Sequence, residues 1–228
     1  MTLVWASLLL LLGVLVMSAP AVAHHHTTHR LPRFGPCHIR GSKLLYHDAR
    51  VEVVRGPPLF IEGAEREPSE AMWKVYSCVP RGRAHYLLSI GWVDRWFGNS
   101  IDHVTLAGRF GAFHVVESSS IDIFDHVAVF DLATGHRVAQ DVGDSTYFRV
   151  FTALVLDKAG AAAWTYSTVT HDPNQKGQPP VALYGASTTH AAAVLDTGTI
   201  DSTSVTVSAT TVSWTNAGTP RQADLSGP

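Results

Sequence analysis

The sequence is poor in charge and in helix-forming residues. Charged residues make up only 16% of its 228 positions, with 17 basic and 19 acidic residues. This balance excludes the clustered basic face of a nucleic-acid-binding protein. Hydrophobic residues make up 46% of the chain, which excludes an intrinsically disordered class. The chain is therefore long and apolar enough to form a packed core.

The motifs that mark common enzyme and metal sites are missing as well. The sequence has no G-x-S-x-G elbow, no H-E-x-x-H, no phosphate-binding glycine loop and no EF-hand pattern. A catalytic triad assembled from distant loops stays compatible with this, because triad residues have no fixed order along a chain. We therefore name no catalytic residue, expect no cofactor, and favour a non-enzymatic role.

The first 23 residues have the pattern of a secretory signal peptide. Residues 3–17 form an apolar run of 15, shorter than the roughly 20 that a membrane-spanning helix needs. The small residues Ala-Val-Ala at 21–23 form a cleavage pattern that places the mature start at His24. No Lys or Arg precedes the apolar run, so an uncleaved anchor is the alternative. We expect a secreted, extracellular protein with no stable membrane span after cleavage.

Cysteine is almost absent. The two cysteines, Cys37 and Cys78, stand 41 positions apart. Oxidising compartments favour a bridge between such a pair in an exported chain, and closing this loop is worth about 3–4 kcal/mol in the chain-entropy model. No C-x-x-C motif is present, so we expect a structural disulfide rather than a redox-active one.

Short strand patterns recur along the chain at intervals of about fifty residues. Three similar strand pairs end in an aromatic residue, at intervals of 51 and 50: Phe113, Trp164 and Trp214. A second kind of strand pair contains three apolar positions that are each 54 apart: Val75, Val129 and Leu183. Period-two alternation and turn residues at 131–135 and 158–160 favour hairpins over helices.

This pattern predicts an all-β fold of repeated antiparallel four-stranded units. We expect a signal peptide at 1–23, a flexible His-containing segment at 24–41, and a β domain at 42–225 with three full units and one partial unit. Such units resemble β-propeller blades, so the expected fold is a small or incomplete β-propeller-like domain. An open β-meander or a β-sandwich is the alternative.

The chain also resembles uncharacterised secreted proteins of actinobacteria. The motifs that carry this resemblance are LAGR at 106–109, VFDLATG at 129–135, LDTGTI at 195–200 and VSWTNAG at 212–218. The resemblance covers nearly all of the mature chain and implies the repeated β fold. It implies no activity and assigns no catalytic residue.

Three groups of residues are candidates for binding chemistry. After cleavage, the amine and imidazole of His24, or the amine together with His26, would suit Cu(II) or Ni(II); the alternative is a solvated tail that binds metal incidentally. Trp92 and Trp96 could form a platform for a sugar ring, although we favour packing between adjacent sheets. Two carboxylates and an imidazole lie close together at 122–126; a calcium or zinc site could use them, but their spacing matches no known ligand loop, so we expect them to be solvated at a hairpin end.

The sequence thus favours a binding or protein-interaction module whose loops recognise an extracytoplasmic protein or a carbohydrate. A secreted hydrolase or lyase on a propeller scaffold is the first alternative. Copper or nickel binding through the tail that begins at His24 is the second.

Overall fold

The structure is a computed structural model that describes residues 36–59, 73–80, 84–88, 90, 98–118, 123–141, 144–145, 149–169 and 179–227. Regular structure in these ranges is β-strand, apart from the short 3-10 turn η1 (Pro36–His38). No helix in these ranges is long and apolar enough to cross a membrane. The all-β prediction is confirmed.

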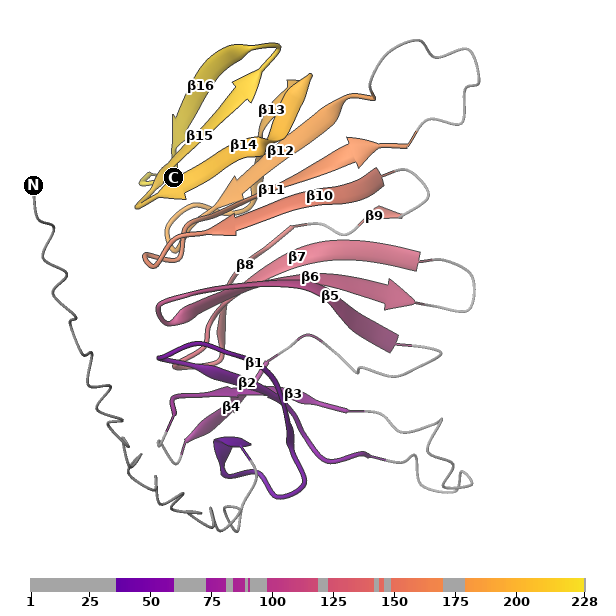
Figure 1. The fold of residues 1–228 in the computed structure, drawn as a ribbon, viewed down its shortest axis with the longest axis vertical. Helices are drawn as coiled ribbons and strands as arrows, with labels where there is room; N and C mark the ends of the chain where they lie inside the picture. Colours follow the sequence, from indigo (N-terminus) through magenta and orange to yellow (C-terminus); the bar gives the residue numbers. More distant parts are fainter. Residues whose placement is uncertain are drawn as a thin grey trace, which may run out of the picture. The chain divides into compact units, whose positions relative to one another are not determined.

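The strands form four antiparallel sheets, and each sheet follows the order of the sequence (Figure 1). The first sheet contains β1 (Lys43–His47), β2 (Glu52–Arg55), β3 (Val75–Cys78) and β4 (His85–Leu87). The second contains β5 (Gly98–Ala107), β6 (Phe110–Ser118), β7 (Ile123–Asp131) and β8 (His136–Gln140), with the short β9 (Asp144–Ser145) paired to β7. The third contains β10 (Arg149–Leu156), β11 (Ala162–Thr168), β12 (Val181–Ala186) and β13 (Ala193–Gly198). The fourth contains β14 (Ile200–Ser208), β15 (Thr211–Asn216) and β16 (Thr219–Asp224).

One hydrophobic cluster fills each gap between successive sheets. The first and second sheets share a cluster that includes Val53, Val75 and Phe130. The second and third sheets share another, and the third and fourth share a further one. Among the described residues no core cluster joins the first sheet to the fourth, so the units form an open series. The predicted repeat of antiparallel β units is confirmed.

The aromatic residues that recur in the sequence occupy equivalent places. Phe113, Trp164 and Trp214 each lie on the second strand of a sheet and pack toward the preceding sheet. Phe113 and Trp164 are 0% exposed and Trp214 is 5% exposed. Each aromatic therefore fills one gap between sheets, as the repeat interval predicts.

The alanine run before Trp164 forms part of β11, as expected of a strand packed closely between neighbours. Side chains of successive residues point to opposite faces of a strand. Ala162 accordingly packs toward the second sheet, and Ala163 toward the fourth. Both residues are 0% exposed, so small side chains let the third sheet pack between two neighbours.

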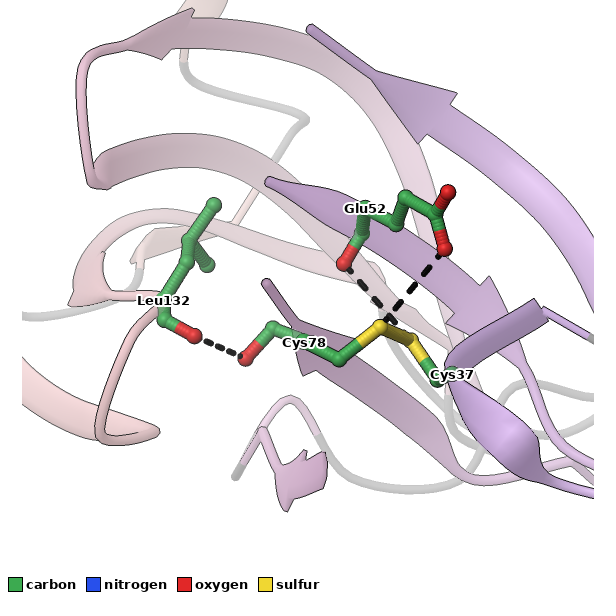
Figure 2. The surroundings of a disulfide bond; sticks show 5 residues. Cys37, Glu52, Cys78 and Leu132 are labelled. Carbon is green, nitrogen blue, oxygen red and sulfur yellow. Dashed lines mark hydrogen bonds between the residues drawn. A yellow bond between two sulfur atoms is a disulfide. The ribbon is translucent and has the colours of Figure 1, made fainter. Parts of the chain in front are cut away.

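Two corresponding hydrogen bonds tie neighbouring sheets together. Ser77 Oγ donates to the carbonyl oxygen of Leu132 at 2.8 Å, which links the first sheet to the second (Figure 2). Ser187 Oγ donates to the carbonyl oxygen of Leu225 at 2.7 Å, which links the third sheet to the fourth. In both cases the acceptor follows the third strand of the later sheet, so the repeat extends to polar contacts.

Candidate functional site

The predicted disulfide between Cys37 and Cys78 is formed, with an S–S distance of 2.06 Å (Figure 2). It joins the segment around η1 to β3. Glu52 of β2 lies against it: the carbonyl oxygen is 3.9 Å from Cys37 Sγ and a carboxylate oxygen is 3.7 Å from Cys78 Sγ. Both sulfurs are consumed by the bridge, so this group of two cysteines and a carboxylate does not form a thiolate metal site.

The other candidates from the sequence lie outside the described residues. His24 and His26 of the proposed mature N-terminus belong to this group, as do Trp92 and Trp96. The metal tail and the aromatic platform therefore stay predictions.

A groove of about 420 Å³ lies where hairpin turns of the second and third sheets meet. Its lining comes from the β5–β6 turn, from the β7–β8 hairpin and from the connection between β12 and β13: Arg109, Phe110, Asp131, Thr134, His136, Val138 and Thr188. The volume falls within the usual range of about 300–1,000 Å³ for small-molecule sites. The lining combines hydroxyl groups, a cation and an aromatic ring.

Local hydrogen bonds fix the β7–β8 wall of this groove. Asp131 Oδ1 accepts the backbone N–H of Ala133 at 3.1 Å, and the Asp131 carbonyl accepts that of Gly135 at 2.8 Å. Gly135 has φ of 71°, a left-handed conformation that glycine adopts without strain. Asp131 Oδ2 forms an ion pair with Arg109 Nη2 at 3.2 Å, and the Arg109 side chain is 62% exposed. The turn predicted from the sequence thus holds an exposed guanidinium in place.

A chain of charged side chains lies buried between the second and third sheets. Arg149 of β10 donates from Nε to Asp125 Oδ1 at 2.8 Å, and from Nη2 to the Asp125 carbonyl at 2.6 Å. Asp125 Oδ2 lies 2.9 Å from Nε2 of His114 on β6. Because a carboxylate only accepts hydrogen bonds, Nε2 of His114 is the donor in this contact.

Asp141, which follows β8, continues this buried network. Asp141 Oδ1 accepts the backbone N–H of Val127 at 2.7 Å, and Oδ2 accepts the indole N–H of Trp164 at 3.1 Å. Arg149 Nη2 lies 3.9 Å from the same Oδ2. Burial raises the pKa of Asp141 to about 6, although these donors and the nearby cation act in the opposite direction.

Aromatic rings enclose the network. The guanidinium of Arg149 lies 3.7 Å from the centroid of the Tyr166 ring, and Phe151 stacks on the imidazole of His114 at a centroid distance of 4.0 Å. Burial raises the pKa of Tyr166 far above its usual range, so the phenol stays protonated. The cation is therefore held between carboxylates and a neutral aromatic face.

The expectation that residues 122–126 are solvated at a hairpin end is wrong for the two ionisable residues that the structure describes. Asp125 is 2% exposed and His126 is 5% exposed. They point to opposite faces of β7, so Asp125 meets Arg149 of the third sheet. Burial lowers the pKa of His126, whose Nδ1 lies 3.7 Å from Glu117. The physical reason is that β7 starts at Ile123 and already lies between two sheets at these positions.

Sequence reasoning missed the members of this network because they lie on three separate strands and in the segment after β8. One signal was available. Asp125 lies on the same face of β7 as Val127 and Val129, and both valines point into the gap between the second and third sheets. A charged residue on the inward face of a strand is rarely buried without a partner, so this position could have indicated that Asp125 is buried and paired, but not which residue is its partner.

Comparisons with protein families, with curated proteins and with solved structures find no match to this chain.

Proposed function

We propose that this protein is an extracytoplasmic binding module that recognises a polyhydroxylated ligand of the carbohydrate type in the groove at Arg109. The observation that carries the proposal is the convergence of three connections from two sheets on one polar groove. Rigid sheets that present turns in this way are a common recognition scaffold.

The chemistry of the lining supports a sugar rather than an anion or an apolar ligand. The ion pair of Arg109 with Asp131 offers donors and acceptors side by side, which suits neighbouring hydroxyl groups. Thr134 and Thr188 add hydroxyls, and Phe110 adds an apolar ring surface. An anion would be repelled by the carboxylate of Asp131, which lies beside the guanidinium of Arg109.

Export is part of the proposal. The disulfide between Cys37 and Cys78 is of the kind that persists in oxidising compartments. Together with the signal-peptide pattern at residues 1–23, it supports a secreted protein. The resemblance to secreted proteins of actinobacteria stays a prediction.

The hydrolase or lyase alternative would need an available base in an open site. In the groove, both oxygens of Asp131 are engaged, one by Ala133 and one by Arg109. In the buried network, Asp125 is held by Arg149 and His114. Neither carboxylate is free of a partner, which leaves the imidazole of His136 as the other candidate base in the groove.

The test is a nuclear magnetic resonance titration of the secreted protein with maltose, cellobiose and chitobiose as probes. We expect at least one disaccharide to shift the amide signals of residues 109–110, 131–136 and 188, and Arg109→Ala to weaken binding by about tenfold to a hundredfold, since a lost charged hydrogen bond is worth about 1.5–3 kcal/mol.

Arg221→Ala is the matched control for this titration. Arg221 pairs with Asp196 at 3.1 Å, and its side chain is 50% exposed, so the variant removes a comparable ion pair from the fourth sheet. Binding should be unchanged in this variant. Amide shifts away from the groove, equal losses in both variants, or no binding of any probe would contradict the proposal.

A further inference from the structure

The outer end of the charged network contains an unsatisfied imidazole nitrogen. Nδ1 of His114 has no hydrogen-bond partner within the part of the chain that the structure describes, although His114 is only 3% exposed. The nearest charged atom is Oδ2 of Asp102 on β5, at 3.4 Å. The Asp102 side chain is 66% exposed, so the network ends at a carboxylate that contacts solvent.

When His114 is neutral, two hydrogen-bond acceptors face each other at this point. Nε2 then donates to Asp125, which leaves a lone pair on Nδ1, 3.4 Å from a carboxylate oxygen of Asp102. A cation between the two atoms would turn this unfavourable pair into two ligands. Zinc binds imidazole nitrogen and carboxylate oxygen at about 2.0–2.2 Å, and two tetrahedral ligands at that distance lie about 3.3–3.5 Å apart. The observed separation of 3.4 Å matches this geometry.

A bulge in β5 brings a third candidate ligand to the same face. The pairing of β5 with β6 shifts between Ile101 and His103, and His103 pairs directly with His114. The ring of His103 lies 5.5 Å from that of Phe151, the ring that stacks on His114. Bulges of this kind re-aim side chains and are frequent next to functional sites. His103 is exposed, so its side chain is able to turn toward Asp102.

We propose that Asp102, His103 and His114 form a binding site for a divalent cation of the zinc type, with open positions toward solvent. The distance between His114 Nδ1 and Asp102 Oδ2 is already that expected between two ligand atoms of one ion. His103 completes the set by rotating its side chain.

Asp125 and Arg149 act behind this site as positioning residues. A metal-binding histidine commonly donates its other ring N–H to a carboxylate, which fixes the ring and makes it a better ligand. Asp125 fills this role for His114, and Arg149 fixes Asp125 in turn. The buried network thus orients a metal ligand at its solvent end.

The test is a titration of the full chain with Zn²⁺, followed through the ring ¹⁵N signals of the histidines. We expect the Nδ1 signal of His114 to shift and to saturate. Asp102→Asn and His103→Gln should each lower the affinity of this site by about tenfold or more, because even outer-shell partners are worth about 10–100-fold. Asp102 and His103 are exposed, so the two variants leave the core unchanged.

His47→Gln is the matched control, because His47 is an exposed histidine on β1 of the first sheet. It should leave the shift of the His114 signal intact. The proposal fails if Zn²⁺ binds only through other histidines while the His114 ring signals stay unchanged up to millimolar metal. It also fails if both ring nitrogens of His114 are protonated and Zn²⁺ does not displace a proton, since an imidazolium then bridges Asp102 and Asp125 instead.

Discussion

At the scale of single residues, Asp141 is unusual because its carboxyl group is buried, and burial disfavours the charged form. It is 6% exposed, and burial outweighs the donors from Val127 and Trp164. The folded protein therefore binds a proton at Asp141 more tightly than the unfolded chain, whose Asp residues titrate near 3.9. This difference links stability to pH through one side chain.

Protonation of Asp141 should stabilise the fold below pH 4, and this contribution should be lost as pH rises through about 6. With a shift of about two pKa units, the cost of the ionised form at neutral pH is about 3 kcal/mol. Asp141→Asn removes the titrating group with little change in shape. Between pH 4 and 7 the free energy of unfolding of the natural protein should therefore fall relative to that of the variant, as measured by urea denaturation.

The comparison isolates Asp141, because every other titrating group is present in both proteins. Arg149 and Asp125 also face Asp141; they keep their contacts with each other in the variant, while Arg149 loses its ion pair with Asp141. A difference between the two proteins that stays constant from pH 4 to 7 would show that burial does not raise the pKa of Asp141.

At the scale of elements, the tight turns determine how closely the sheets approach. Gly160, in the β10–β11 turn, has φ of 88°. A Cβ atom at this position would lie 2.9 Å from an edge carbon of the Phe110 ring, which belongs to the second sheet. The glycine is thus needed twice, once for its backbone conformation and once for the contact between sheets.

Gly160→Ala should therefore lower the stability of the protein by more than the conformational penalty of a left-handed alanine would. Gly218 supplies the matched comparison, because it has φ of 76° but nothing within 4 Å of its added Cβ. We expect Gly218→Ala to cost about 1–2 kcal/mol, from backbone strain. Gly160→Ala should cost about 1–3 kcal/mol more, from overpacking against Phe110. Thermal unfolding of the two variants measures the difference, and equal losses would mean that the Phe110 ring moves aside freely.

The elements could be predicted from the sequence, and the contacts of the buried charges could not. Period-two alternation and turn residues are local signals, so strands such as β7 and β11 and the turn at Asp131 follow from neighbours in sequence. The recurring Trp164 and Trp214 identified the gaps between sheets for the same reason. The pairing of Asp125 with Arg149 depends on which faces of two sheets meet. No local pattern contains that information.

The bulge in β5 illustrates the same limit at the proposed metal site. Asp102 and His103 are adjacent in sequence, and regular alternation would place their side chains on opposite faces. The shift in pairing after Ile101 changes this, and it depends on the partner strand β6. The candidate site could therefore be assembled only from the structure.

At the scale of the whole molecule, the sheets form a series, and the core clusters of the described residues join neighbouring sheets. Such arrays behave approximately as a sum of unit stabilities and nearest-neighbour interfaces. The disulfide between Cys37 and Cys78 lies in a small cluster with Val54, Ile39 and Tyr76, on the first sheet. Its stabilising effect should therefore be largest in that sheet.

Replacing both Cys37 and Cys78 by alanine should remove about 3–4 kcal/mol from the first unit, the value expected for a bridge that closes a loop of 41 residues. Hydrogen exchange should become faster in β2 and β3, change less in β6, and stay almost unchanged in β15. The gradient follows from the packing, because within the described ranges β15 contributes to a cluster with the third sheet and to none with the first. Equal loss of protection in β2 and β15 would show instead that the four sheets unfold as one cooperative unit, and a disulfide at one end would then stabilise a ligand site anywhere in the series.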